Sequence, residues 1–174
     1  MVKKVERRIL SELMKNSRRS DRELARVIGS SQPTVTRARN RLEKEGYIQE
    51  YTIMPDFLKL GYEILAVTLF KYKKQFDVEK IEKAKKILAD SFERGPFEII
   101  MAERGTGCGY NAMMISIHKD YKSFMDLMDW GQQFYSLELG EFDTFLINLA
   151  GKVRYRPLTF SSLAKHLLTL EREK

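Results

Sequence analysis

The sequence contains few of the residues that build metal, disulfide or redox sites. It has one cysteine, Cys108, and two histidines, His118 and His166, which lie far apart in the chain. One cysteine excludes an intramolecular disulfide and a paired-cysteine zinc or redox motif, and two distant histidines do not form a metal site by themselves. We therefore expect no metal, no cofactor and no catalytic residue.

Long hydrophobic runs are also missing. No stretch approaches the roughly 18 apolar residues that a membrane-spanning helix requires. Charged residues interrupt the apolar pattern of the first segment, MVKKVERRILSEL. Since 43% of the 174 residues are hydrophobic, the chain still has enough apolar side chains for a core. The composition predicts a globular cytoplasmic protein with no membrane partner.

Positive charge is abundant but unevenly distributed. Residues 1–50 hold 13 Lys and Arg against 7 Asp and Glu, whereas residues 51–174 hold 18 against 17. Nearly all of the net charge of +7 therefore belongs to the first third of the chain. Such asymmetry indicates that one end of the molecule meets a polyanion.

The first third of the chain has the pattern of short amphipathic helices. Apolar residues recur at helical spacing over residues 3–15 and predict a first helix there. Ser20 and Glu23 have the spacing of a capping box, in which each side chain bonds the backbone of the other residue, and they predict the start of a second helix. Gly29 ends that helix, because glycine readily takes the left-handed conformation found there.

A third helix follows after only a short turn. Ser31 is placed to cap it, and the helix is predicted over residues 32–45, with Gly46 as its stop. The alternating stretch 47–54 then predicts a short strand, or wing. The inner side of the third helix is formed by three apolar residues, Val35, Ala38 and Leu42.

The outer side of the third helix carries polar and cationic side chains. Arginine and lysine neutralise phosphates, while glutamine, asparagine and arginine match the edges of adenine and guanine in the major groove. A solvated charged surface is the alternative for this helix taken alone. The capped helix before it, the tight turn and the local charge surplus favour a helix-turn-helix. The predicted DNA contacts are Ser31, Gln32, Thr34, Thr36, Arg37, Arg39, Asn40, Arg41 and Lys44.

The rest of the chain predicts a second domain of mixed structure. Its pattern has the order β-α-β-β-α-β, which is typical of a ferredoxin-like sheet and gives an α+β fold class. Apolar residues occupy both faces of the strands, so the second sheet face needs a cover, and a second copy of the chain is the simplest one. The predicted strands are residues 62–72, 97–103, 111–118 and 141–150, and the predicted helices are residues 78–92 and 121–137.

Four motifs in residues 9–62 match a known pattern: ILSEL, RELA, GSSQPTVTRARNRLEKEGYI and YTIMPDFLKLGY. They resemble the Lrp/AsnC (feast/famine) family of transcription regulators. The resemblance implies a winged helix-turn-helix that binds specific double-stranded DNA. We expect the protein to form dimers, and the question whether dimers assemble further into tetramers or octamers stays open. Ala38 stands where the family often has arginine, which leaves Arg37 and Arg39 as the leading contacts.

The later part resembles, at lower identity, the small-molecule-binding RAM domain of the same family. The family's effector turn is usually GDYD, whereas this chain has ERGTGCGYNA. Gly109 and Asn111 fall near the acidic positions, so the ammonium group of an amino acid would lose its counter-ion, and the effector stays open. By resemblance, the effector contacts are Thr106, Gly107, Cys108, Gly109, Tyr110 and Asn111.

The domains expected from these patterns are a DNA-binding domain over residues 1–55, a linker over 56–61 and a dimerisation and effector domain over 62–151. Residues 152–174 form an extension whose helix Ser161 or Ser162 would cap. We expect Cys108 to be a spectator thiol and His118 to be exposed at a strand end.

Two other functions remain open. Some siroheme-type decarboxylases resemble this family in both domains, and an enzyme or ligand-binding protein of that kind would not use DNA. The sequence shows no clustered histidine, tyrosine and arginine set for a tetrapyrrole. A winged helix that associates with RNA or ribosomes would instead prefer structured RNA.

Overall fold

The computed structural model describes residues 2–72, 98–135, 139–152 and 158–169. The chain forms two compact units. Unit 1 comprises residues 1–55 together with 154–174, and unit 2 comprises residues 56–153. The predicted helix at 78–92 lies outside the described residues.

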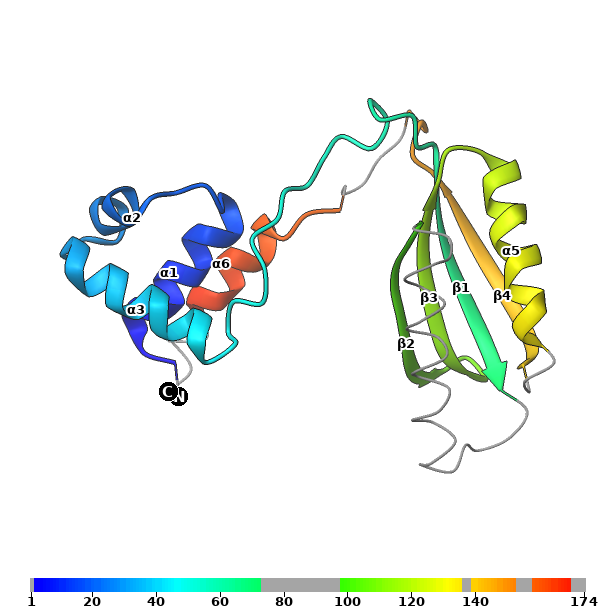
Figure 1. Cartoon of the computed structure of the whole chain (residues 1–174), viewed down its shortest axis with the longest axis horizontal. Helices are drawn as coiled ribbons and strands as arrows, with labels where there is room; N and C mark the ends of the chain where they lie inside the picture. Colours follow the sequence, from blue (N-terminus) through cyan, green and yellow to red (C-terminus); the bar gives the residue numbers. More distant parts are fainter. Residues whose placement is uncertain (1, 73–97, 136–138, 153–157, 170–174) are drawn as a thin grey trace. The chain divides into compact units, whose positions relative to one another are not determined.

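Unit 1 is helical (Figure 1). The capping box predicted for its second helix is present: the Ser20 hydroxyl accepts from the Glu23 amide at 3.3 Å, and the Glu23 carboxylate accepts from the Ser20 amide at 2.7 Å. Gly29 follows with a φ of 68°, as a left-handed helix end requires. The helices are α1 (Lys4–Lys15), α2 (Asp21–Ile28), α3 (Gln32–Lys44) and α6 (Ser161–Thr169).

The core of unit 1 joins α1, α2 and α3. The three residues predicted for the inner side of α3 all lie in it, which confirms that the helix is oriented as its periodicity indicates. Burial of these apolar side chains is the main term that holds three short helices together. The buried members are Ile9, Leu13, Leu24, Ala25, Ile28, Val35, Ala38 and Leu42.

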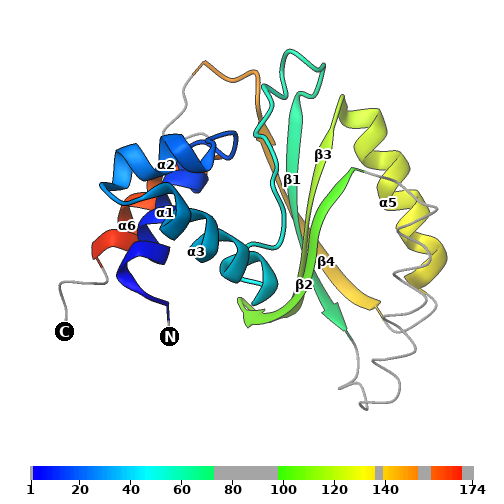
Figure 2. The ribbon, with the colours of Figure 1, turned by 60° about the vertical axis from the view of Figure 1, so that its left-hand side comes forward.

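The C-terminal helix α6 also belongs to unit 1. It packs along α1 on the side away from α3 (Figures 1 and 2). At the contact, the Ser11 hydroxyl donates to the Ala164 carbonyl at 2.7 Å, and both residues are fully buried. The predicted cap of α6 was wrong in detail. The helix begins at Ser161 itself, and the Thr159 hydroxyl accepts from the Ser161 amide.

The predicted wing strand over residues 47–54 is not formed. All of these residues are described, and none of them is in a strand. An extended segment becomes a strand only when its backbone pairs with another. Here the segment is fixed by isolated contacts instead, one of which is the Ser17 hydroxyl donating to the Thr52 carbonyl at 3.0 Å.

Unit 2 contains an antiparallel four-stranded sheet in the order β2-β3-β1-β4. Helix α5 (Tyr121–Tyr135) packs on one face of it (Figure 2). The described elements follow the predicted chain order, and the strand ends differ from the predicted ones by at most four residues. The strands are β1 (Ile64–Tyr72), β2 (Ile99–Gly107), β3 (Tyr110–His118) and β4 (Leu139–Asn148).

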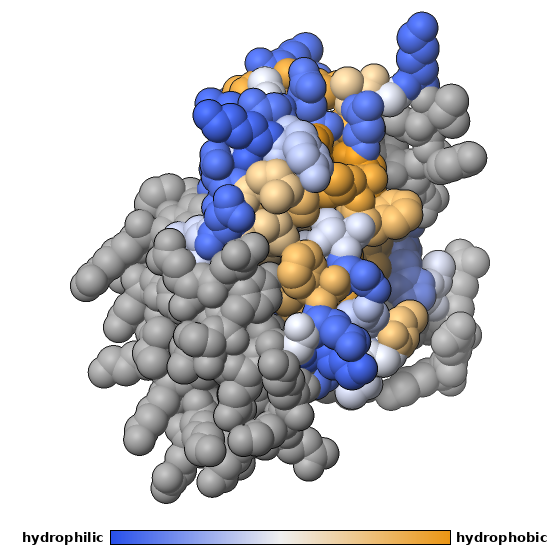
Figure 3. All heavy atoms as spheres, turned by 90° about the vertical axis from the view of Figure 1, so that its right-hand side faces the viewer, coloured by the Kyte–Doolittle hydropathy of each residue, from blue (hydrophilic) through white to orange (hydrophobic). Residues whose placement is uncertain are grey.

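The two faces of this sheet are both apolar, as predicted. On the side of α5, Ala66 and Met114 pack with Phe124, Leu127 and Met128 of the helix. In the view of Figure 3, hydrophobic residues gather in patches between hydrophilic ones.

The opposite face, here called the open face, is covered by no element of unit 2 among the described residues. Val67 lies at its centre, with Ile115 of β3 on one side and Phe145 of β4 on the other. Phe145 is 71% exposed. The remaining apolar residues whose register places them on this face are Leu65, Leu69, Met101, Met113, Ile117 and Ile147.

His118 is not exposed, which corrects the sequence-based expectation. Its side chain is fully buried, with Nε2 at 2.8 Å from the Ser116 hydroxyl and its ring edge-on to Phe124. Nδ1 has no partner among the described residues. The strand end is buried because α5 begins three residues later and folds back over it.

Candidate nucleic-acid interface

The predicted contact residues of helix α3 differ in their exposure to solvent. Its inner stripe is fixed in the core, so the remaining positions point outward or flank that core. The exposed residues of the predicted set are Ser31, Gln32, Arg37, Asn40 and Lys44. The half-buried ones are Thr34, Thr36, Arg39 and Arg41.

Arg37 and Lys44 are the cations of α3 that remain free of acidic partners. Arg37 donates from Nε to the Pro33 carbonyl one turn earlier, at 3.2 Å, which leaves its charge unneutralised. Neither residue forms an ion pair with any residue that the structure describes. A free, exposed guanidinium and ammonium on one helix are suited to pair with phosphates.

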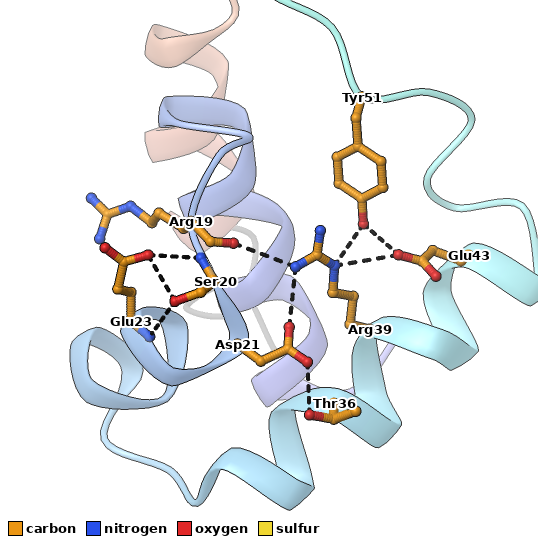
Figure 4. A network of polar contacts seen from close by, with 8 residues as sticks. All are labelled: Arg19, Ser20, Asp21, Glu23, Thr36, Arg39, Glu43 and Tyr51. Carbon is orange, nitrogen blue, oxygen red and sulfur yellow. Dashed lines mark hydrogen bonds and ion pairs between the residues drawn. The ribbon is translucent and has the colours of Figure 1, made fainter.

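Arg39 is held by protein groups instead. Its Nη1 donates to the Asp21 carboxylate at 3.1 Å and to the Arg19 carbonyl at 3.4 Å. Its Nε donates to the Tyr51 hydroxyl at 2.8 Å and lies 3.3 Å from a Glu43 oxygen. The guanidinium also lies 4.8 Å from the centre of the Tyr51 ring (Figure 4).

These contacts form one continuous network, which we call the Arg39 network. The other Asp21 oxygen accepts from the Thr36 hydroxyl at 2.7 Å, and the Tyr51 hydroxyl donates to Glu43 at 2.6 Å. Partial burial lowers the pKa of Arg39, but its hydrogen bonds to Tyr51 and Asp21 outweigh this effect and raise the pKa above the ordinary arginine value. Burial, together with the bond to Glu43, raises the pKa of Tyr51.

Arg41 is also paired within unit 1. Nη1 donates to the Glu6 carboxylate at 2.9 Å, and Nε donates to Glu45 at 2.7 Å. The Glu6 side chain is almost fully buried, and its second oxygen accepts from the Lys3 amide at 2.6 Å. The Arg41 charge therefore ties α3 to the start of α1.

The N-terminus of α3 differs slightly from its predicted form. Ser31 holds the capping position, but its hydroxyl bonds the Thr34 hydroxyl at 2.8 Å rather than a backbone amide. Pro33 lies in the first turn, where no intrahelical donor is lost.

Two cations outside the predicted set lie on α2. Arg22 and Arg26 are one helical turn apart and both are exposed. Their spacing of four residues makes them neighbours on the surface of α2, and this spacing is the sequence signal that could have identified them. In a helix-turn-helix the first helix crosses the DNA backbone, so these residues are additional candidates for phosphate contacts.

The predicted effector residues form the tip of the β2–β3 hairpin. Cys108 and Gly109 have φ angles of 52° and 82°, and they connect the paired residues Gly107 and Tyr110. Positive φ at both central residues is the geometry of a tight two-residue hairpin turn, and it explains the glycine. Thr106 to Gly109 are exposed, whereas Tyr110 and Asn111 are half-buried.

The hairpin tip is attached to β4 through Tyr110. Its hydroxyl donates to the Asp143 carboxylate in a short hydrogen bond, which raises the pKa of Tyr110. The structure thus brings the predicted effector residues together on one turn.

The described part of the chain shows neither a metal-binding arrangement nor a bilayer-spanning helix. Within it, no three histidine, cysteine, aspartate or glutamate residues are grouped to hold a metal ion. None of its helices combines the length and apolar character needed to cross a membrane.

Comparison with known proteins agrees with the geometry of unit 1. Residues 3–49 match the family model described as winged helix-turn-helix DNA-binding. The match covers α1, α2 and α3.

Curated relatives are HTH-type transcriptional regulators of archaea. One from Pyrococcus abyssi is 30% identical over 104 residues, which cover 58% of this chain and 71% of the relative. PH0061 of Pyrococcus horikoshii is 36% identical over 78 residues, 45% of this chain and 52% of that protein. The chain spans about half the length of the first curated relatives that it matches.

Solved structures extend the similarity to both units. The crystal structure of PH0061 has a TM-score of 0.70 at 25% identity and covers 91% of this chain and 99% of its own. Bacillus subtilis LrpC has a TM-score of 0.66 at 24% identity, with 90% and 99% covered, and so supports the fold.

Proposed function

Because the chain belongs to the Lrp/AsnC family of transcription regulators, we propose that it binds specific double-stranded DNA and regulates transcription as a dimer. The observation that carries this proposal is the outer face of α3, where Gln32, Arg37, Asn40 and Lys44 are exposed on a helix whose inner stripe is fixed. The position of the helix in a helix-turn-helix suits it to the major groove. The proposal requires no catalytic residue and places the protein in the cytoplasm with the DNA.

The exposed residues of α3 divide by chemistry. Gln32 and Asn40 are able to pair with adenine edges, and Arg37 is able to pair with guanine or with a phosphate. Lys44, together with Arg22 and Arg26 of α2, would neutralise the backbone on either side. The half-buried Thr36, Arg39 and Arg41 would contribute through the position of α3 rather than through direct contact.

The dimer is supported by the open face of unit 2. Its apolar residues include Phe145, which is 71% exposed in the single chain. A two-fold pair of such faces would bury them in an interface that is the same from both sides. Two copies would present two α3 helices to half-sites about 34 Å apart or a multiple of it, and larger assemblies of such dimers are compatible with this arrangement.

The hairpin tip is the candidate contact for a small-molecule effector. Residues 106–111 offer backbone groups and, with β4, the Tyr110–Asp143 pair. Asp143 supplies the negative charge that the turn itself lacks. Thermal-shift screening of amino acids and other small metabolites against the wild type and Asp143→Asn tests whether a ligand binds at this end of the sheet.

The DNA proposal is tested in two steps. The purified protein first selects fragments of genomic DNA, and its affinity for these fragments is then measured at several salt concentrations. Log affinity is expected to fall linearly with log salt, with a slope of about 0.9 per phosphate neutralised. Arg37→Ala is expected to lower affinity by about 1–3 kcal/mol per half-site, because its charge is free and exposed. If Arg37 meets a phosphate, the slope also falls by about one.

The matched control is Lys15→Gln, which removes a cation from α1 that is already paired with Glu12. It should leave affinity nearly unchanged. If the wild type and Arg37→Ala bound DNA equally at every salt concentration, this result would contradict the proposal that α3 is the DNA-contacting helix. A wild type that binds structured RNA more tightly than duplex DNA would favour the RNA-associated alternative.

A further inference from the structure

The Arg39 network joins four segments of unit 1. Arg19 precedes α2, Asp21 begins it, Glu43 lies near the end of α3, and Tyr51 belongs to the extended segment after α3 (Figure 4). The guanidinium of Arg39 is the group that touches all four. No other side chain in the network reaches both the α2 side and the segment that contains Tyr51.

Two of the three nitrogens of the Arg39 guanidinium, Nε and Nη1, are already directed at protein acceptors. Nε and Nη1 together make four contacts of 2.8–3.4 Å, and the side chain is only 20% exposed. A guanidinium that turned Nε or Nη1 toward a phosphate would have to leave Tyr51 or Asp21. Arginine's rigid planar fork suits it to hold several fixed acceptors at once, a role that lysine does not reproduce.

The network also supplies a constraint that the apolar core lacks. The core fixes which side of α3 faces inward and reaches the start of the segment at residues 47–55 through Ile48, but it includes no later residue of that segment, which has no strand pairing. The bonds to Asp21 set α3 against the start of α2, and the bonds to Tyr51 hold that segment along α3. The same segment leads the chain into unit 2.

From these contacts we infer that Arg39 is a positioning residue for DNA binding: it orients α3 and, through Tyr51, attaches the connecting segment to the recognition helix. This inference rests on the proposed function. It assigns Arg39 and Tyr51 a role different from that of Arg37, although Arg37 and Arg39 are two residues apart on one helix.

Two variants separate positioning from phosphate contact. Arg39→Lys keeps the charge and removes the planar fork, and Tyr51→Phe keeps the ring and removes only the hydroxyl. Positioning predicts that Arg39→Lys weakens DNA binding about tenfold and Tyr51→Phe about threefold, as loss of hydrogen bonds to a charged group implies. Both should keep the wild-type salt slope, because neither removes a phosphate contact.

Two further readouts complete the experiment. The double variant should bind about as tightly as Arg39→Lys alone, because both changes break one network. Hydrogen exchange should accelerate over residues 47–55 in both single variants. Tyr47→Phe is the matched control, since Tyr47 lies in the same segment outside the network, and it should change neither binding nor exchange.

Other results would overturn the inference. Retained affinity in Arg39→Lys, or unchanged or tighter binding in Tyr51→Phe, would identify Arg39 as a simple phosphate contact. Tyr51→Phe removes one oxygen atom from an exposed side chain, so this variant is expected to fold. It therefore tests the inference even if the Arg39→Lys protein does not fold. Failure of the wild type to bind DNA would instead reject the proposed function, and this outcome is distinct from a defect confined to the variants.

Discussion

His118 is expected to make the stability of unit 2 depend on pH. Burial lowers the pKa of this histidine below its ordinary value of about 6.5. At a pH between the two values, the unfolded chain binds a proton that the folded chain excludes. The stabilisation is therefore complete above about pH 6.5 and is lost as the pH falls through the folded-state pKa.

The measurement uses Trp130, the single tryptophan of the chain, which packs against the core of unit 2. The thermal midpoint followed by its fluorescence should decrease between pH 7 and pH 5 in the wild type. His118→Gln should flatten that decrease, and His166→Gln, a change at an exposed histidine, should not. A wild-type midpoint that is constant over this range would contradict the prediction.

Individual side chains were predictable from the sequence only in part. Helical spacing was sufficient to place Gln32, Arg37 and Asn40 on an exposed face, because exposure follows from periodicity. Spacing could not show that Arg39 meets Asp21, which lies eighteen residues earlier, since that contact depends on the angle between two helices. The exposure of His118 was mispredicted because its burial depends on how α5 packs over the end of β3.

At the scale of elements, helix α6 is expected to stabilise the DNA-binding helices. Ala164 is fully buried against α1 and its carbonyl accepts from Ser11. Ala164→Leu should destabilise unit 1 by about 1–3 kcal/mol, because the added atoms have no free space at this helix contact. Ser11→Ala should cost about 1 kcal/mol, the value of one buried hydrogen bond.

Hydrogen exchange of the α1 amides measures this effect, with the thermal midpoint from Trp130 fluorescence as a control for unit 2. Leu163→Ala is a matched change on the exposed side of the same helix, where 48% of the residue surface is accessible. It should have little effect on α1. Equal exchange in the wild type and Ala164→Leu would show that α6 does not support the unit.

The elements themselves were largely predictable because local signals mark them. Caps and stops such as Ser20 and Gly29 fixed the ends of α1, α2 and α3 to within about one residue. The wing at residues 47–54 was mispredicted, since alternation indicates an extended backbone but cannot supply a pairing partner. The packing of α6 against α1 depends on a contact between the two ends of the sequence.

At the scale of the whole molecule, the strand order and the apolar open face predict a two-fold assembly. Phe145→Asp is expected to weaken the dimer at least a hundredfold, because it places a charge among the apolar residues of the open face, which the dimer would bury. Analytical ultracentrifugation measures the dissociation constant. DNA affinity should fall with it, because a single chain engages only one half-site.

Tyr121→Asp is the control for this prediction. Tyr121 is 59% exposed at the start of α5, on the other side of the sheet. It should leave the dimer intact. A Phe145→Asp protein that sediments as the wild type does would show that the open face is covered in some other way.

The course of the backbone has a practical consequence. Because unit 2 is inserted between α3 and α6, two peptide segments join the units, and both leave the sheet where Ile64 and Asn148 are paired. Cleavage by a protease in one of these segments would leave both pieces associated through α6 and α1. A fragment cut after residue 55 would lack its fourth helix, so an isolated DNA-binding module should be built by fusing residues 1–55 to 158–174 through a short flexible linker.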